Sequence, residues 1–120
     1  MTAKPETITI FHNPACGTSR NVLAAIREAG HEPKVVEYLK AGWTRPQLEG
    51  LLADMHATPR DILRVRGTPA EELELTGPKV TDDAILCAMV AHPILVERPI
   101  VAAPKGTALC RPAERVNTLL

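Results

Sequence analysis

The chain has 120 residues, of which 45% are hydrophobic and 23% charged, values typical of one globular domain. Its 14 basic and 14 acidic residues balance, so the net charge does not favour a nucleic-acid partner. One Phe, one Tyr and one Trp are too few for a platform that stacks bases. No apolar run approaches the roughly 20 residues that span a bilayer, and residues 1–7 lack the apolar segment of a signal peptide. We therefore expect a cytoplasmic protein that binds neither nucleic acid nor membrane.

The N-terminal part of the chain predicts a β-α-β unit. Residues 7–11 alternate and are rich in β-branched side chains, which indicates a strand, and the Pro and Gly of residues 12–17 indicate a loop. A helix is predicted from Ser19, as its cap, to Gly30, which ends it. Residues 34–38 read as a second strand, parallel to the first through a right-handed crossover.

The middle of the chain predicts helices that begin at threonine caps. Thr44 opens a capping box with a proline just inside its helix, and Thr58 repeats the pattern before a short helix ending at 64–67. Residues 69–75 predict another short helix, and Thr81 caps a helix with an acidic first turn. The side chains predicted to be buried are Leu48, Leu51, Leu52 and Met55 in the first of these helices and Ile85, Leu86, Met89 and Val90 in the last.

The C-terminal part predicts a hairpin and a last helix. His92-Pro93 stops the preceding helix, strands 100–103 and 107–110 flank a turn, and residues 113–119 form a helix. The order β-α-β, helical insert, β-β-α is the order of a thioredoxin-like α/β fold with a four-stranded mixed sheet. We expect a single domain over residues 1–120 with the helical insertion at about 44–92.

The loop after the first strand carries the chemistry. Cys16 lies just before the first helix, where unpaired N–H groups and the helix dipole favour both a thiolate and a bound oxyanion. His12 is expected to support the thiolate. The residues predicted to bind the anion are Gly17, Thr18, Ser19 and Arg20. Three simpler interpretations stay open: Cys16 as a small buried hydrophobe, His12 as a structural hydrogen-bonding group, and Ser19 as a helix cap only.

The chain has three cysteines, Cys16, Cys87 and Cys110. Their odd number and wide spacing predict neither a disulfide framework nor a metal site. Ser19 stands where a C-x-x-C motif would have its second cysteine, so Cys16 needs an external thiol to complete a redox cycle. Cys87 is expected to be a buried structural thiol. Cys110, beside Arg111, is the less favoured candidate for a resolving thiol.

Residues 8–21 closely resemble the signature of glutaredoxin-dependent arsenate reductases, and segments 81–83, 92–95, 98–101 and 109–112 resemble that family in register. The resemblance implies that Cys16 is the nucleophile and that three arginines surround the substrate, with Asn13 in a supporting role. It also implies that Pro99 is the cis proline that faces the cysteine in thioredoxin-like folds. By register the three arginines are Arg64, with Arg66 as its less favoured neighbour, Arg98 and Arg111.

The implied activity is reduction of arsenate to arsenite, with glutathione as co-substrate, glutaredoxin as protein partner and no tightly bound cofactor. Two alternatives stay open. A glutathione-dependent thiol reductase of the same fold would keep Cys16 without needing all three arginines. A redox-related regulator that binds RNA polymerase is disfavoured by Ser19, because such regulators use a C-x-x-C pair.

Overall fold

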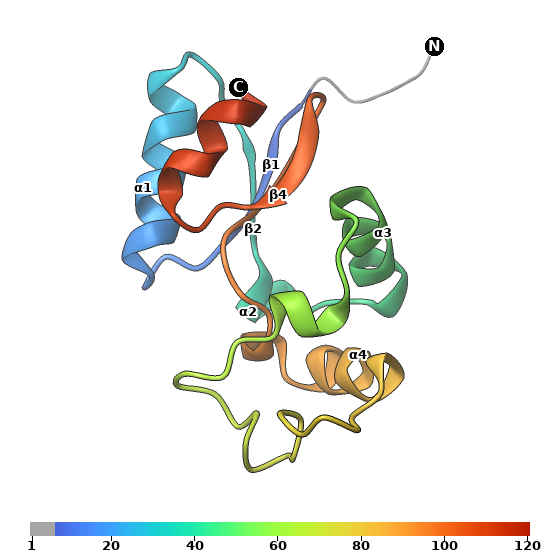
Figure 1. The fold of residues 1–120 in the computed structure, drawn as a ribbon. Helices are drawn as coiled ribbons and strands as arrows, with labels where there is room; N and C mark the ends of the chain where they lie inside the picture. The colour runs from blue at the N-terminus through green and yellow to red at the C-terminus, as the bar shows by residue number, and fades with distance from the viewer. Residues whose placement is uncertain (1–6) are drawn as a thin grey trace. The chain divides into compact units, whose positions relative to one another are not determined.

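The computed structural model describes residues 7–120 and divides into two compact units (Figure 1). The first contains the chain up to Ala41 together with Arg98–Leu120, and the second is Gly42–Glu97. The prediction that the chain lacks a signal peptide concerns residues 1–7, and all of these but residue 7 lie outside the described residues. The expectation of one domain with an insertion at about 44–92 stays a prediction.

The first unit is built on a mixed sheet in the order β2-β1-β3-β4. Strands β1 and β2 pair in parallel, with His12 opposite Glu37, whereas β3 is antiparallel to both β1 and β4. The predicted four-stranded mixed sheet is therefore confirmed. The strands are β1 (Thr9–His12), β2 (Lys34–Glu37), β3 (Ile100–Ala103) and β4 (Gly106–Leu109).

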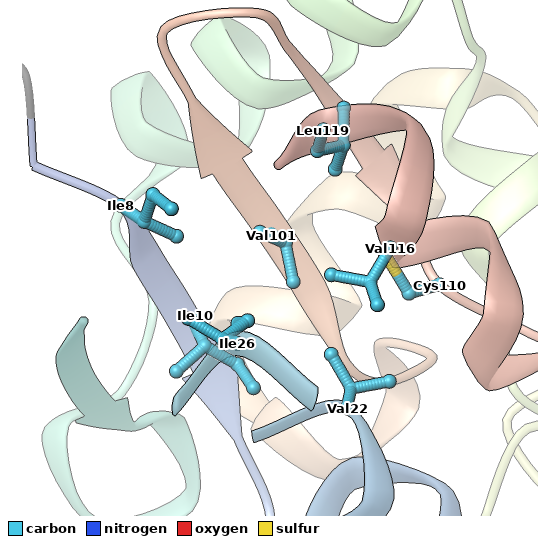
Figure 2. Packing of buried hydrophobic residues seen from close by; sticks show 8 residues of the cluster. All are labelled: Ile8, Ile10, Val22, Ile26, Val101, Cys110, Val116 and Leu119. Carbon is cyan, nitrogen blue, oxygen red and sulfur yellow. The ribbon is translucent and has the colours of Figure 1, made fainter. Parts of the chain in front are cut away.

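Helix α1 (Gly17–Glu28) and the 3₁₀ helix η3 (Ala113–Leu119) pack beside each other against this sheet (Figure 1). Alternate strand residues point to the same face, so Ile8 and Ile10 join the apolar stripe of α1. Figure 2 shows the resulting core, in which the sulfur of Cys110 lies among aliphatic side chains. Its buried members are Ile8, Ile10, Val22, Ile26, Val101, Cys110, Val116 and Leu119.

The start of α1 differs from the prediction. Cys16, with extended backbone angles (φ −95°, ψ 123°), is the N-cap residue, and the helix begins at Gly17. Ser19 is fully buried inside the first turn and does not cap the helix, because its hydroxyl is engaged with the end of β1. The other end agrees with the prediction, since Gly30 follows the C-cap with a positive φ of 94°.

Strand β2 ends one residue earlier than predicted. Tyr38 begins the one-turn helix α2 (Tyr38–Ala41) instead of closing the strand. This change of backbone direction places the tyrosine at the carboxyl end of the parallel pair β1–β2.

The second unit consists of capped helices. Its elements are α3 (Arg45–Met55), the 3₁₀ helix η1 (Pro59–Ile62), α4 (Asp82–Ala91) and the 3₁₀ helix η2 (Pro93–Leu95). The predicted caps at Thr44, Thr58 and Thr81 are all confirmed. Arg45 joins the starts of α3 and α4 through a 2.7 Å ion pair with Asp83.

Two predictions about the helices of this unit are wrong. The short helix that begins at Thr58 ends at Ile62, and residues 69–75 form turns and no helix. Glu74 adopts a left-handed φ of 60°, and Leu75 N–H bonds to Ala70 O at 2.9 Å. A left-handed residue followed by a bond of this kind is the arrangement that ends helices, so the segment stops after one turn.

Three side chains of this unit are less buried than predicted. Met55 is half-buried, Val90 is 38% exposed and Cys87 is exposed. Helix α4 buries Ile85, Leu86 and Met89, and Cys87, the residue directly after Leu86, lies on another face of the helix. Cys87 is thus a surface thiol, 3.5 Å from Arg45 Nη1.

The capping box at α3 provides a test of local stability. Thr44 Oγ1 accepts a hydrogen bond from Gln47 N–H at 3.2 Å, and Gln47 Oε1 accepts one from Thr44 N–H at 3.3 Å. We expect Thr44→Ala to lower the free energy of unfolding by about 1 kcal/mol, because a helix N–H loses its acceptor. Urea denaturation measures the change. Thr44→Ser keeps the acceptor and should unfold like the wild type, and equal midpoints for all three proteins would contradict this account.

Within residues 7–120, no helix has the length and apolar character needed to cross a membrane.

Candidate active site

The candidate site begins in the loop between β1 and α1. Asn13 organises this loop: its carbonyl accepts a hydrogen bond from Cys16 N–H at 3.0 Å, and its side-chain Oδ1 accepts one from Ala15 N–H at 2.9 Å. Cys16 O in turn accepts the first hydrogen bond of α1, from Arg20 N–H at 3.0 Å. The thiol therefore sits at the N-terminus of α1, as the sequence predicts.

His12, Asn13 and Ser19 form a buried polar network behind this loop. A 2.6 Å hydrogen bond joins His12 Nδ1 and Ser19 Oγ, and Asn13 N–H donates to the same hydroxyl at 3.1 Å. Burial is the main cause that holds the pKa of His12 below its ordinary value, so the imidazole is neutral at neutral pH. The network ties the end of β1 to the first turn of α1 and thereby positions the residues between them.

Two of the three predicted arginines lie at the same edge of the sheet as Cys16. Arg98 precedes β3 and Arg111 follows β4, and these strands are antiparallel neighbours with Ile100 opposite Leu109. The Arg98–Pro99 peptide is cis, as predicted, and the Arg111–Pro112 peptide is also cis, which was not predicted. Arg111 Nη1 donates to the carbonyl of Arg98 at 3.1 Å and lies 3.8 Å from Cys16 Sγ.

The guanidinium of Arg98 has unused hydrogen-bonding capacity. Its Nε and Nη1 atoms are buried and have no hydrogen-bond partner among residues 7–120. A buried N–H group without an acceptor is unfavourable, so these donors favour a ligand that accepts hydrogen bonds. A tetrahedral oxyanion offers paired oxygens that match the fork of an arginine.

The same surroundings act on the thiol. Burial raises the pKa of Cys16, but the backbone N–H of Ser19 and the guanidinium groups of Arg98 and Arg111 lower it by more, to about 7. A substantial fraction of Cys16 is therefore thiolate at neutral pH, whereas an ordinary cysteine is mostly protonated. The interpretation of Cys16 as an inert buried hydrophobe does not fit this environment.

This shift predicts a pH dependence. The rate of Cys16 alkylation should follow a titration with a midpoint at about 7. Because the folded-state pKa lies below that of the unfolded chain, this group stabilises the fold fully above the unfolded pKa and loses that contribution as pH falls through about 7. Iodoacetamide labelling of a variant that keeps only Cys16, followed by mass spectrometry between pH 5 and 10, measures the midpoint. A midpoint near that of free cysteine would contradict the predicted thiolate.

The other predicted anion-binding residues form the first turn of α1. Gly17 is exposed and Thr18 is half-buried. Arg20 is exposed and its Nη1 donates to Pro14 O at 2.8 Å, so its guanidinium holds the loop. Binding of an anion by these residues stays a prediction.

Arg64 lies in the second unit. Its Nη1 donates to Glu97 Oε1 at 2.9 Å, and its backbone N–H donates to Leu95 O at 2.7 Å. The ion pair is largely buried, with side chains 17% and 23% exposed. Sequence analysis did not foresee this pair, because the partners lie 33 positions apart. A role for Arg64 at Cys16 stays a prediction.

Sequence analysis also missed Tyr38, which is fully buried at the site. Burial raises the pKa of Tyr38, while the charge of Arg98 and the polar side chain of Asn13 act in the opposite direction. One signal was present in the sequence. A tyrosine that follows a strand parallel to β1 lies at the sheet edge that carries Asn13, and a buried phenol needs a polar partner.

The remaining cysteines differ in environment. Cys110 is fully buried in the core of Figure 2, and burial raises its pKa to about 11. It is thus a neutral thiol packed among aliphatic side chains, which does not favour the resolving role. In the described part of the chain, no three His, Cys, Asp or Glu side chains are grouped as they would be to hold a metal ion.

The β-α-β and β-β-α order, the mixed sheet, the cysteine at the start of the first helix and the cis proline before β3 define a thioredoxin-like protein. Residues 11–119 match the model of the ArsC family, and the chain belongs to that family.

Relatives with similar sequences and structures agree with this assignment. The chain is 59% identical to "Arsenate reductase ArsI2" of Synechocystis sp., over 94% of this chain and 81% of the relative. It is 52% identical to "Arsenate reductase" of Escherichia coli K12, over 94% of this chain and 80% of the relative. The solved structure "Arsenate reductase from Vibrio cholerae" superimposes with a TM-score of 0.90 at 33% identity, covering 98% of this chain and 100% of that one.

Proposed function

We propose that this protein is an arsenate reductase that converts arsenate to arsenite, with Cys16 as its nucleophile. The observation that carries the proposal is a thiol of lowered pKa close to Arg98, whose buried Nε and Nη1 have no hydrogen-bond partner among residues 7–120. The Cys16 thiolate attacks the substrate, and the Arg98 guanidinium binds its negatively charged oxygens. The names of the relatives support arsenate as that substrate.

The oxyanion site combines donors from several elements. Arg98 and Arg111 flank Cys16, and the first N–H groups of α1, from Gly17 to Ser19, face the same end of the helix. Arg64 completes the set by its register with the family. Positive groups fixed before the reaction stabilise charge on the arsenate oxygens without reorganising during the chemical step.

The reaction proceeds by nucleophilic catalysis. The Cys16 thiolate attacks arsenic, and an arsenate oxygen leaves as water after taking up protons. A glutathione thiolate then forms an S–S bond with Cys16, the electron pair of the S–As bond passes to arsenic, and arsenite departs with arsenic in the trivalent state. Glutaredoxin removes the glutathione from Cys16 and regenerates the thiol.

This cycle places the protein in the cytoplasm, where a glutathione pool keeps thiols reduced. Glutathione acts as a co-substrate, and the scheme needs no tightly bound cofactor or metal. Its partners are arsenate, glutathione and glutaredoxin, with no nucleic acid or membrane.

The test is a coupled assay with arsenate, glutathione, glutaredoxin, glutathione reductase and NADPH. We expect NADPH oxidation that depends on arsenate and stops when either glutathione or glutaredoxin is omitted. Oxidation that needs arsenate and glutathione but not glutaredoxin would retain the reductase and remove the protein partner.

Protection of Cys16 from alkylation by arsenate distinguishes an arsenate reductase from a glutathione-dependent thiol reductase. Arsenate should slow the alkylation of Cys16, with sulfate and phosphate as competing oxyanions. A reduced, folded protein that reduces mixed disulfides but shows neither arsenate turnover nor protection would favour the thiol reductase. Retention of RNA polymerase on the immobilised protein, with no enzymatic activity, would favour the regulator.

A further inference from the structure

The hydroxyl of Ser19 joins the first turn of α1 to the end of β1. Ser19 lies in that turn and is fully buried. Its Oγ lies 2.6 Å from His12 Nδ1 and accepts a hydrogen bond from Asn13 N–H at 3.1 Å. His12 and Asn13 are buried as well, with 5% of each residue exposed. Hydrogen bonds between buried groups are costly to break, because the separated groups do not reach water.

The partners of Ser19 determine the direction of its bond to His12. The Ser19 oxygen already accepts from Asn13 N–H, and its own O–H needs an acceptor, because buried polar groups are hydrogen-bonded. The lone pair of His12 Nδ1, 2.6 Å away, supplies that acceptor. All groups are then satisfied, with the imidazole hydrogen on Nε2. The opposite tautomer would direct two donors at one oxygen and leave the hydroxyl hydrogen without an acceptor in this network.

The same hydroxyl holds the loop that carries Cys16. Asn13 donates its N–H to Ser19 Oγ, and the Asn13 carbonyl accepts a hydrogen bond from Cys16 N–H at 3.0 Å. Arg20, the residue after Ser19, donates its N–H to Cys16 O at 3.0 Å. These bonds form a ring from Ser19 through Asn13 and Cys16 back to α1. Removing the Ser19 hydroxyl opens this ring where it meets β1.

We propose that Ser19 is a positioning residue, whose hydroxyl holds His12 as the Nε2–H tautomer and keeps the Cys16 loop against the first turn of α1. Helix N–H groups stabilise a thiolate only at close range, so the hydroxyl thereby sets the reactivity of Cys16. The hydroxyl hydrogen is given to His12, so any contact of Ser19 with an oxyanion comes from its backbone N–H. The effect on the thiol is independent of the substrate, whereas the effect on turnover rests on the proposed function.

The first test is nitrogen NMR of protein with isotope-labelled histidines at neutral pH. We expect His12 to show a protonated Nε2 and an unprotonated Nδ1, and His12→Gln identifies its signals among the four histidines. In Ser19→Ala the Nδ1 resonance should move toward that of an imidazole nitrogen without a hydrogen bond. A protonated Nδ1 in the wild type, or an Nδ1 resonance that Ser19→Ala leaves unchanged, would overturn the proposal.

The second test is the iodoacetamide titration of Cys16. We expect Ser19→Ala to raise its midpoint by about half a pH unit or more, because the N–H groups of α1 stabilise the thiolate less well once the loop is loosened. The control is Val22→Ala, which truncates another fully buried side chain of α1. Val22→Ala lowers stability through the core but should keep the wild-type midpoint. An unchanged midpoint in Ser19→Ala, or an equal rise in Val22→Ala, would contradict the positioning role.

A double variant tests whether Ser19 and His12 act together. In a His12→Gln background, Ser19→Ala should shift the Cys16 midpoint by less than it does in the wild type, because one of its two partners has already been replaced. Shifts that simply add would show that the two residues act separately and would overturn the proposed coupling. If Ser19→Ala does not fold, the wild-type spectrum still decides the direction of the bond, on which the proposal depends.

Arsenate kinetics distinguish positioning from direct binding of the oxyanion. Ser19→Ala should lower kcat/KM at pH 7 by about twofold to fivefold and recover at higher pH, since its defect lies in the ionisation of Cys16. A raised KM that persists at high pH would mean that the side chain binds the oxyanion, against the proposal. If the wild type shows no arsenate turnover, the proposed function fails, whereas the NMR and alkylation measurements still decide the role of Ser19.

Discussion

Cys16→Ser is expected to abolish arsenate-dependent NADPH oxidation, with a loss of at least about a thousandfold in kcat. The surroundings of Cys16 lower its pKa to about 7, but a serine hydroxyl in the same place stays protonated and is a poor nucleophile. Serine also cannot form the S–S bond through which arsenic gains its electron pair. Both defects act on the chemical step, so KM should change much less than kcat wherever residual turnover is measurable.

The control for this prediction is Cys87→Ser. Cys87 is an exposed thiol on α4 with no part in the proposed cycle, so its removal should leave kcat unchanged. Circular dichroism and thermal unfolding should show that both variants are folded. A Cys16→Ser protein that kept wild-type activity would refute the proposed mechanism.

Arg98→Ala is expected to cause the second largest loss, about 100-fold to 1000-fold in kcat/KM. Two effects combine. The oxyanion loses the buried Nε and Nη1 donors, and the thiolate loses a positive neighbour, so the pKa of Cys16 rises. At pH 7 a smaller fraction of Cys16 is then ionised.

Measurements at two pH values separate these effects. Raising the pH above the new thiol pKa should restore the ionisation of Cys16 and recover part of the lost activity, while the defect in arsenate binding persists as a raised KM. Arg98→Lys keeps the charge but loses the paired donors, so it should recover the thiol pKa more than the KM.

Arg27→Ala is a suitable control for Arg98→Ala, because Arg27 pairs with Glu32 at the surface, with side chains 50% and 75% exposed. Its removal should leave kcat/KM within about twofold. Equal losses for Arg27→Ala and Arg98→Ala would mean that general charge, and not the position of Arg98, supports the activity.

Local sequence signals predicted most of the secondary structure correctly. Thr44, Thr58 and Thr81 mark helix starts because a threonine hydroxyl or a capping box supplies acceptors within three residues. Gly30 marks a helix end because it adopts a positive φ. These interactions join neighbours in the chain, so they can be recognised without knowing the fold.

Errors occurred where a neighbour from another segment decided the outcome. Ser19 was predicted to cap α1, but its hydroxyl binds His12 and Asn13 at the end of β1, and Cys16 takes the cap position. Residues 69–75 have the composition of a helix, but a left-handed Glu74 closes the first turn. Cys87 sits among apolar residues in sequence and is exposed on the helix.

By itself, the sequence predicted the position of Cys16 at the start of a helix and the elements around it. The strand, the Pro-Gly loop and the helix place a thiol at a helix N-terminus, and this juxtaposition is local. Motifs in register with a family added Arg98, Arg111 and the cis Pro99. Only the tertiary structure brought Tyr38 and Asn13 to Arg98, paired Arg64 with Glu97, and buried Cys110 in the core. These contacts depend on the pairing of β1 with β2 and β3, and of β3 with β4, because strand pairing brings side chains from distant segments to one edge of the sheet.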